Sequence, residues 1–475
     1  MLKSSVLLIY SLSKEGKLLL KNANIIANGN NLKKVNILVE NKKIKEIFEG
    51  NIPYGIEDKE IIDCSNYIVF PGFIDAHVHF DDPGYTDRED FFTGTQSAAK
   101  GGVTTIVDMP CTSVPEVISK ENLHYKLDIV SKKAIVDFAF WGGVTPIQIQ
   151  TGEYKKTIKE LKEEGVVGLK LYTISGMKTY PKVNTEEMAA VFDYIRDLGL
   201  VAGIHAEDFE LVDYFSKREQ NLNHIYPLAW TKGRNYEAEA VAILRSIALA
   251  KEFKNKVHIV HLSTKLGLMI IEMAKNEGIN ITTETCPHYL VFNENDLERI
   301  GPILKTAPPV RRREDSEYLW DGLKKGSVDF VTTDHAGGVY PQEKNKQSIW
   351  DNYAGIPGVQ TRFNVLFTYG YSTGRLTLED LRKVLSEKPA ERFGLKSKGK
   401  IEIGNDADFV IVNPYGEFKF NASKDLLCKN KYSPFDGFTF KGEIEKTIVR
   451  GQIVYEKDKG ITVNGGFGKF VKSEY

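Results

Sequence analysis

The sequence has few cysteines, almost no net charge and no long apolar run, and each absence excludes a class of protein. Its four cysteines lie far apart and form neither a zinc-knuckle nor a disulfide pattern: Cys64, Cys111, Cys286 and Cys428. With no recognisable signal peptide, this usage predicts a reducing cytoplasm. A formal net charge of -1 argues against a nucleic-acid or anionic-membrane surface. No segment reaches the ~20 apolar residues that a transmembrane helix needs.

What the sequence has is the composition of an ordinary globular protein, with 42% hydrophobic and 27% charged residues in 475. That length is enough for one large domain and a smaller one. From Pro71 onward, apolar runs alternate with amphipathic helix-like segments, which is the rhythm of parallel β/α units. Eight strand-like runs are present, at residues 73–79, 103–109, 135–141, 166–172, 201–205, 257–262, 279–285 and 328–334.

Eight such units predict a (β/α)8 barrel, and residues 71–395 fall within the usual length of that fold, roughly 200 to over 400 residues. In one unit, Asn184 and Glu187 predict a capped helix start and Gly199 the helix end. Residues 1–70 and 396–475 instead show short β-branched runs broken by Asn and Gly, which is typical of hairpins. The predicted fold class is therefore α/β: a TIM-type barrel at 71–395, with a small composite β-sandwich domain built from both chain ends, 1–70 and 396–475.

Six residues in or at the ends of these runs are of types that hold two divalent metals around an activated water: His77, His79, Lys170, His205, His261 and Asp334. In such barrels the carboxyl ends of the strands meet at one mouth. His77 and His79 are two residues apart in a strand, so both imidazoles can reach one metal. A lone His-x-His has an ordinary explanation as surface chance, but six matching residues favour a metal site.

Lys170 is the unusual member, because an ammonium group cannot bind a cation. Burial among Leu169, Leu171 and Tyr172 should lower its pKa, and a neutral amine can take up CO2 as a carbamate. A lysine paired with a nearby carboxylate is the alternative, and the spacing leaves it open.

The chain also resembles a known family, the cyclic amidohydrolases, which include dihydroorotase, hydantoinase, dihydropyrimidinase and allantoinase. The matching motifs are PGFIDAHVHF (71–80), GGVTT (101–105), DMP (108–110), GLK (168–170), HAE (205–207), HLS (261–263), ETCPHYL (284–290), PPVR (308–311), TDH (333–335) and GNDAD (404–408). The resemblance covers nearly the whole chain. It implies two metal ions, usually zinc, held by the six residues above, with Lys170 carboxylated to N6-carboxylysine by CO2.

The reaction implied by the resemblance is hydrolysis of an amide bond in a small ring. A hydroxide between the two metals attacks the ring carbonyl, and Asp334 carries the proton to the leaving nitrogen. In the family, backbone groups near Cys286 help to hold the ring, and Ser175 is close enough in sequence to Lys170 to reach it. Homodimers or homotetramers are expected from the resemblance alone. A metal-free scaffold protein of the same fold is the alternative from another class, and the retention of all six residues argues against it.

The identity of the ring depends on details. Dihydroorotases usually read the substrate carboxylate with an arginine at the position of Asp81, so a carboxylate there predicts a poor dihydroorotase. The segments around 79–95, 175–181 and 355–360 are most similar to allantoinases, although Tyr85 and Thr112 stand where allantoinases tend to have arginine and asparagine. Hydantoinases and dihydropyrimidinases typically have tyrosine where this chain has Ser175. The prediction is an allantoinase acting on a cyclic ureide, with hydantoinase or dihydropyrimidinase as the alternative.

Overall fold

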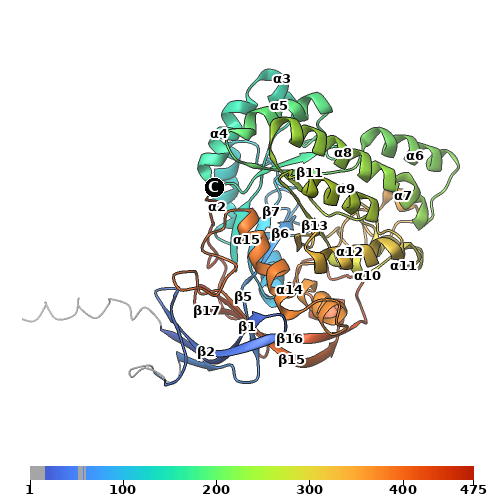
Figure 1. Cartoon of the computed structure of the whole chain (residues 1–475). Helices are drawn as coiled ribbons and strands as arrows, with labels where there is room; N and C mark the ends of the chain where they lie inside the picture. The colour runs from blue at the N-terminus through green and yellow to red at the C-terminus, as the bar shows by residue number, and fades with distance from the viewer. Residues whose placement is uncertain (1–16, 52–56, 58–59, 475) are drawn as a thin grey trace, which may run out of the picture.

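The computed structural model describes residues 17–51, 57 and 60–474, and its largest part is a parallel barrel that rests on a folded β-sheet (Figure 1). The barrel strands are β6 (Phe73–Val78), β7 (Val103–Asp108), β8 (Asp137–Phe140) continued by β9 (Gly142–Gly143), β10 (Leu169–Tyr172), β11 (Val201–His205), β12 (Lys256–Ile259), β13 (Ile281–Thr285) and β14 (Phe330–Val331). Parallel pairing runs through β6-β7-β8 and through β9 to β14. A bridge between Val78 and His335 joins the last strand region to the first. The predicted barrel is confirmed.

The strands are apolar because helices cover their outer side and packed side chains fill the inside. Every residue of β6, β7 and β11 is buried, as expected for parallel strands enclosed on both faces. β14 is shorter than its predicted run, because the chain bends after Val331 and Asp334 takes a left-handed φ of 48°.

The helices that follow the strands form the outer ring. Those packed on the barrel are α1 (Phe91–Lys100), α2 (Lys120–Val130), α4 (Tyr154–Glu164), α5 (Thr185–Arg196), α8 (Tyr236–Phe253), α9 (Lys265–Asn276) and α12 (Arg313–Lys325). The remaining helices are α3 (Pro146–Thr151), α6 (Phe209–Asn221), α7 (Pro227–Gly233), α10 (Pro287–Val291), α11 (Glu294–Ile300), α13 (Arg362–Val365), α14 (Leu378–Arg382), α15 (Lys388–Arg392) and α16 (Ala422–Asp425). Among the described residues, none of these helices combines the length and the apolar character needed to cross a membrane.

Helix α5 shows how local sequence sets the helix ends. Its predicted capping box is confirmed: Asn184 accepts from the amide of Glu187, and the Glu187 carboxylate accepts from the amide of Asn184. The helix ends at Arg196, and Gly199 takes a left-handed φ of 66° three residues later. Gly199 therefore turns the chain toward β11 after the helix has ended.

The second part is a nine-stranded sheet to which both ends of the described chain contribute. Its strands are β1 (Leu18–Asn28), β2 (Asn31–Glu40), β3 (Lys43–Phe48), β4 (Ile61–Asp63), β5 (Ile68–Pro71), β15 (Phe409–Lys419), β16 (Thr439–Val449), β17 (Gln452–Glu456) and β18 (Gly460–Ile461). β5 pairs with β1 on one side and with β15 on the other, which joins the two chain segments. The sheet encloses its own small core, including Ile37, Val69 and Phe409. The predicted composite β domain is thus confirmed as a fold class, while its boundaries remain a prediction and residues 1–16 lie outside the described residues.

A buried ion cluster fastens this sheet to the barrel. The Lys398 ammonium group lies 2.6 Å from Asp137, 2.8 Å from Asp408 and 3.0 Å from Asp406. Arg450 adds a contact of 3.1 Å to the same oxygen of Asp137. Asp137 lies in the barrel strand β8, and Lys398 lies just before β15 of the β domain. The cluster therefore connects the barrel to the β domain through buried ion pairs.

Candidate metal centre at the barrel mouth

The structure gathers the six predicted metal ligands at one end of the barrel. His77 is in β6, His79 is one residue past it, Lys170 is in β10, His205 ends β11, His261 is two residues past β12 and Asp334 is three residues past β14. Parallel strands bring their carboxyl ends to the same mouth, so residues from five strands meet there. Five of the six are buried, and the Asp334 side chain is 14% exposed.

The tightest group is formed by His77, His79 and Asp334. Nε2 of His77 and Nε2 of His79 each lie 3.1 Å from the same carboxylate oxygen, Oδ1 of Asp334. One ligand atom from each of the three residues lies within 4.8 Å of the other two. Burial would raise the pKa of Asp334, but the neighbouring histidines hold it well below its ordinary value. Two imidazoles and an ionised carboxylate that converge in this way suit a divalent metal.

His205 and His261 form a second group beside the first. Nδ1 of His205 and Nε2 of His261 are 2.8 Å apart, and the rings of His77 and His261 are 5.4 Å apart between centroids. His261 and Asp334 have φ angles of 39° and 48°, in a region that residues other than glycine seldom adopt. Strained backbone of this kind is concentrated at functional sites.

Two buried glutamates that the sequence analysis did not assign hold the imidazoles in place. Oε1 of Glu284, in β13, lies 2.5 Å from Nδ1 of His77, and Oε2 of Glu207 lies 2.9 Å from Nε2 of His205. Each carboxylate accepts from the far nitrogen of its ring and leaves the near nitrogen for the site. Burial would raise the pKa of Glu207, but Arg234 and His205 lower it to about 2. Two features of the sequence could have indicated these glutamates: Glu207 lies two residues after His205, and Glu284 is a carboxylate inside an apolar strand.

Lys170 is fully buried and its Nζ has no hydrogen-bond partner among the described residues. Its Nζ lies 4.9 Å from the centroid of the Tyr172 ring. Burial lowers the pKa of Lys170 from 10.5 to about 8, which raises the fraction of neutral amine at neutral pH. The alternative left open by the sequence, a lysine satisfied by a carboxylate, is not what the geometry gives.

The arrangement of these atoms fits metal ions. Lys170 Nζ is a buried polar atom with no hydrogen-bond partner among the described residues, and a buried polar group left in this state costs about 1–3 kcal/mol. His77 Nε2 contacts the Asp334 carboxylate oxygen at 3.1 Å, and a cation would bind both atoms. Conversion of the amine to an anionic carbamate would remove the unpaired donor and add ligand oxygens. The residues present therefore fit divalent metals.

A cavity of about 300 Å³ opens onto these residues and is lined, among others, by His79, Asp334, Ser175 and Tyr353. The Ser175 hydroxyl donates to the carbonyl of Tyr180 at 2.7 Å and accepts from the amide of Met177, so it shapes the loop that lines the cavity. Cys286 is fully buried, is not among the lining residues, and burial raises the pKa of its thiol. Both remain predictions as substrate contacts, and only Ser175 lies at the cavity.

Asp81 requires a correction to the charge argument made from the sequence. Its side chain is fully buried, does not line the cavity, and burial raises its pKa well above the ordinary value. It therefore presents no carboxylate to a substrate. The charged residues that do line the cavity include two arginines that the sequence analysis missed, each already paired. Arg88 donates to Glu343 at 2.9 and 2.7 Å, and Arg234 donates to Glu207 at 3.0 Å.

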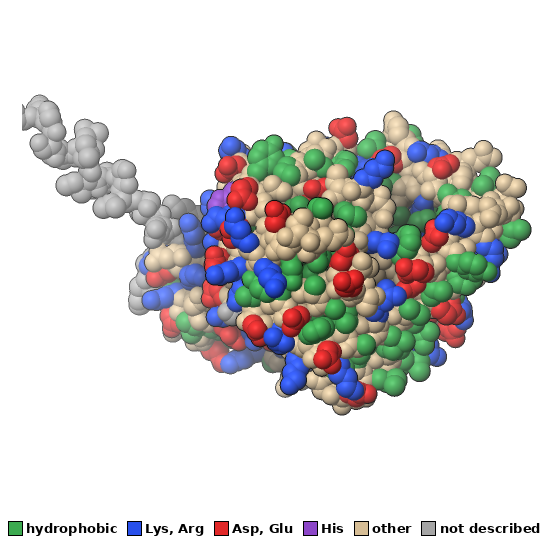
Figure 2. All heavy atoms as spheres, turned by 90° about the horizontal axis from the view of Figure 1, so that it is seen from above, with side chains coloured by type: hydrophobic (Ala, Val, Ile, Leu, Met, Phe, Trp, Pro, Cys, Tyr) green, Lys and Arg blue, Asp and Glu red, His purple; other side chains and the backbone are tan. Residues whose placement is uncertain are grey.

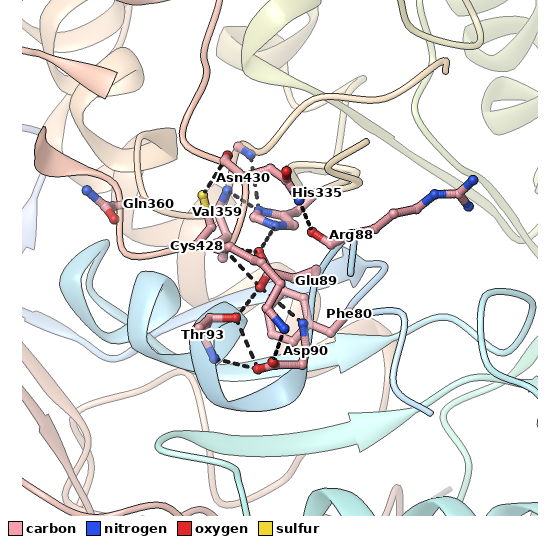
Figure 3. Close-up of polar contacts among 12 residues, drawn as sticks. Phe80, Arg88, Glu89, Asp90, Thr93, His335, Val359, Gln360, Cys428 and Asn430 are labelled. Carbon is pink, nitrogen blue, oxygen red and sulfur yellow. Dashed lines mark hydrogen bonds and ion pairs between the residues drawn. The ribbon is translucent and has the colours of Figure 1, made fainter. Parts of the chain in front are cut away.

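His335 connects the site to a polar network behind it (Figure 3). Its Nδ1 accepts from the amides of Gly358 and Val359, so its Nε2 carries the proton and donates to Glu89 at 3.1 Å. Its carbonyl accepts from the amide of His79 at 2.8 Å. His335 is thus held by three sets of hydrogen bonds and lies between Asp334 and the end of β6.

A (β/α)8 barrel with histidines, a carboxylate and an unpaired lysine around one mouth defines a metal-dependent hydrolase. Residues 68–454 match the Amidohydrolase family, and the chain belongs to this family. It is 37% identical to an allantoinase of Rubrobacter xylanophilus over 417 residues, 88% of this chain and 90% of the relative. It is 36% identical to a dihydroorotase of Methanosphaera stadtmanae over 439 residues, 92% and 96% of the two chains. Among solved structures, the L-hydantoinase of Arthrobacter aurescens superimposes with a TM-score of 0.90 at 32% identity, covering 96% of this chain and 99% of that one.

Proposed function

We propose that this protein opens a ring amide in a small cyclic ureide, with allantoin as the substrate. The observation that carries the chemistry is the convergence of ligand atoms from His77, His79 and Asp334 within 4.8 Å, beside a cavity of about 300 Å³. A cavity of that size suits a small ring. Family membership and relatives named allantoinase support the same reaction class.

Two divalent cations, zinc in our proposal, would be held by the six residues of the mouth. His77, His79 and Asp334 would serve one ion and His205 and His261 the other, with Lys170 as a carbamate between them. When bound, such ions act as Lewis acids and lower the pKa of water toward neutrality. The carbamate requires a neutral amine, and the lowered pKa of Lys170 supports its formation from CO2.

The residues of the chain divide the remaining work. Asp334, whose pKa is held well below the ordinary value, is ionised at neutral pH and can accept a proton from water and donate it to the leaving ring nitrogen. Glu284 and Glu207 fix the orientation of His77 and His205 through their far ring nitrogens. Tyr353, in the loop after β14, lines the cavity and helps to exclude solvent from the ring.

The paired arginines favour an uncharged ring over dihydroorotate. Arg88 and Arg234 line the cavity, but Glu343 and Glu207 balance their charges. A substrate carboxylate would therefore enter without an unpaired cation to meet it, and burying an uncompensated charge is costly. The similarity to L-hydantoinase makes hydantoin and dihydropyrimidines the second candidates, and the dihydroorotase relative makes dihydroorotate the third.

The test is hydrolysis of allantoin, hydantoin, dihydrouracil and dihydroorotate by metal-loaded protein supplied with bicarbonate, with Asp334→Asn as the control. Turnover of allantoin that disappears in the control supports both substrate and mechanism. Turnover of hydantoin or dihydrouracil alone moves the assignment to the second candidates. Efficient turnover of dihydroorotate contradicts the charge argument.

Metal dependence has its own test. Dialysis against a chelator should abolish activity, and zinc with bicarbonate should restore it, while metal analysis of the untreated protein should approach two ions per chain. Protein purified without chelators that holds no zinc, manganese, cobalt or iron would favour the non-catalytic scaffold alternative.

All four cysteines are free and buried, which supports the proposed location in a reducing cytoplasm.

A further inference from the structure

A second cavity lies between the barrel and the β domain. It has a volume of about 290 Å³, close to that of the cavity at the barrel mouth, and it shares no lining residue with that cavity. Barrel helices α1 and α13 form one side, and strands β15, β16 and β17, which lie below the barrel in Figure 1, form the other. We call this cavity the interdomain pocket. Pockets that bind small molecules occur preferentially at such domain boundaries.

The β-domain side of the interdomain pocket is aromatic. Phe420, Phe440 and Tyr455 line it, and each of these side chains is at most 6% exposed. The ring centroids of Phe420 and Phe440 are 5.7 Å apart, and that of Phe418 lies 5.9 Å from that of Phe440. Because the rings pack against one another, they form a fixed apolar wall on which a flat aromatic ring can stack.

The charged residues that line the interdomain pocket are Lys100, Lys419, Lys457, Asp425 and Glu443. Lys457 neutralises Glu443 at 2.5 Å, and the Asp425 carboxylate accepts from the amide of Asn421 at 2.7 Å. In the described part of the chain Lys100 and Lys419 form no ion pair, and Lys100 instead donates to the carbonyl oxygen of Asp425 at 2.7 Å. Two cations of the pocket are therefore left without a carboxylate in contact.

Such a pair of cations favours an anion in the pocket. Burial lowers the pKa of Lys100, and the nearby charge of Asp425 offsets this only in part. A carboxylate brought in by a ligand would supply the missing counter-charge. On the face of the molecule seen from above, by contrast, acidic and basic side chains are intermixed and give an anion no preferred place (Figure 2).

We propose that the interdomain pocket binds a small aromatic carboxylate, with its ring against the aromatic wall and its carboxylate at Lys100 and Lys419. The wall and the two lysines line the same cavity, and a ligand must have both features to satisfy both. An inorganic phosphate ion would leave the wall uncovered. An uncharged ring would leave the lysines without a counter-charge.

Gln360 connects the interdomain pocket to the residues behind the metal centre (Figure 3). Its side-chain nitrogen donates to the carbonyl of Asp425 at 2.8 Å, and its side-chain oxygen accepts from the amide of Leu427 at 3.0 Å. The preceding residue, Val359, donates from its amide to Nδ1 of His335 at 3.3 Å. One residue of the pocket wall is thus adjacent in the chain to a residue that orients His335.

The segment 425–430 gives a second connection. The amide of Lys429 lies 3.3 Å from a carboxylate oxygen of Glu89, and Glu89 accepts from His335. At the start of this segment, the Asp425 carbonyl is the shared acceptor of Lys100 and Gln360. A ligand carboxylate that draws the Lys100 ammonium group away from this carbonyl would loosen the segment and, with it, the support of His335. Occupancy of the pocket should therefore lower kcat with KM nearly unchanged; this effect rests on the proposed hydrolase function, whereas binding does not.

The first test is binding of benzoate to the metal-loaded protein by isothermal titration calorimetry, with benzamide as the uncharged ring. Lys100→Gln and Lys419→Gln should each raise the dissociation constant of benzoate by about 10-fold, because each removes a charge-assisted hydrogen bond. Lys419 is exposed, so its substitution leaves the fold intact. Lys159→Gln, at an exposed position of α4, is the matched control and should leave the dissociation constant unchanged. Benzamide that binds as tightly as benzoate, or an unchanged dissociation constant in both pocket variants, would overturn the proposal.

Kinetics separate the interdomain pocket from the metal centre. Saturating benzoate should lower kcat of the wild type by about 5-fold with KM unchanged, and Lys100→Gln should abolish this effect. Benzoate that raises KM alone competes with substrate at the metal centre, and this result would contradict the proposal. If none of the cyclic substrates is hydrolysed, calorimetry with the pocket variants still decides whether the pocket binds an aromatic carboxylate. Failure of the proposed function and failure of this inference are therefore distinguishable.

Discussion

Two buried lysines of this protein differ in their surroundings: among the described residues one has no hydrogen-bond partner, and the other is held by three carboxylates. Lys398 contacts three aspartates within 3.0 Å, and these aspartates raise its pKa against the effect of burial. Lys170 has no hydrogen-bond partner in the described part of the chain, and burial lowers its pKa to about 8. Both are fully buried, so burial alone does not decide the outcome; the number of carboxylates in contact does.

Two groups of side chains have ligand atoms close enough together to hold a metal, and they also differ in whether a lysine ammonium group lies among them. At the junction, Asp137, Asp406 and Asp408 meet the geometric requirement for a cation site, but the Lys398 ammonium group already occupies the space between them. At the mouth, the ligand atoms of His77, His79 and Asp334 converge with no protein cation between them among the described residues. The first group is therefore an ion-pair cluster that joins the barrel to the β domain, and the second is the group whose ligand atoms can bind a metal.

The largest expected effect comes from removing the reactive lysine. Lys170→Ala should lower kcat/KM by at least ~1000-fold, about 4 kcal/mol of transition-state stabilisation, because the proposed carbamate ligand can no longer form. Thermal stability measured without metal should stay the same or rise, since a buried unpaired amine is removed. Enzyme assay, metal analysis and calorimetry on the same preparation check this. Full activity in the variant would show that Lys170 plays no part in the metal site.

Removal of Lys398 should have the opposite effects: a loss of stability with activity retained. Lys398→Met removes the cation shared by Asp137, Asp406 and Asp408, of which the first and last are buried, and this should cost about 3–5 kcal/mol of unfolding free energy. Because the cluster lies between the barrel and the β domain, kcat and metal content of the folded fraction should be close to wild type. Urea unfolding at pH 7 gives the stability, and assay at low temperature gives the activity. A stable variant that has lost its metal would reverse the assignment of the two lysines.

A smaller effect on kcat is expected from Glu89, which contacts His335 and not the proposed metal ligands directly. Glu89→Gln weakens the hydrogen bond that orients His335, next to Asp334, and should lower kcat by about 10- to 100-fold with KM little changed. Asp90→Asn is the control, because it removes the neighbouring charge but keeps a side chain able to cap α1. Steady-state kinetics distinguish the two. Equal losses in both variants would mean that Glu89 acts through the stability of α1 and not through His335.

The sequence was sufficient for the barrel, the composite β domain and the convergence of six site residues. Parallel strands with buried faces have a strong apolar signature, and their carboxyl ends must meet, so counting strands along the chain is enough to place His205 and His261 together. The sequence was not sufficient for the partners behind the ligands. Glu284 reaches His77 across 207 positions of sequence, and that contact depends on how β13 packs beside the mouth.

Asp81 shows the other limit. The spacing of His77, His79 and Asp81 suggests three side chains on one face of a strand, but β6 ends at Val78 and Asp81 has a left-handed φ of 52°. Side chains alternate between the two faces only as far as the strand extends, so Asp81 need not share a face with His77 and His79. The side chain therefore turns into the protein, and the charge at the cavity comes from Arg88 and Arg234, each neutralised by a carboxylate that lies far from it in the sequence.

The smallest expected effect is a pH dependence of the junction. The pKa of Lys398 is raised above its ordinary 10.5, so its contribution to stability is fully present below pH 10.5 and is lost as the pH rises toward the higher folded value. One pKa unit is worth about 1.4 kcal/mol. The stability difference between wild type and Lys398→Met should thus be constant from pH 7 to about 10, then shrink by about 1.4 kcal/mol per pH unit above 10.5.

At the acid end the sign reverses. Burial would raise the pKa of Asp406, but Lys398 lowers it below the ordinary 3.8, so that contribution is present above pH 3.8 and is lost as the pH falls below it. Urea unfolding of both proteins across this range, in a constant salt concentration, measures the two limbs separately. A difference that stays constant through pH 11.5 would mean that Lys398 is held by packing of its alkyl chain and not by its charge, and the contrast with Lys170 would then rest on hydrogen bonding alone.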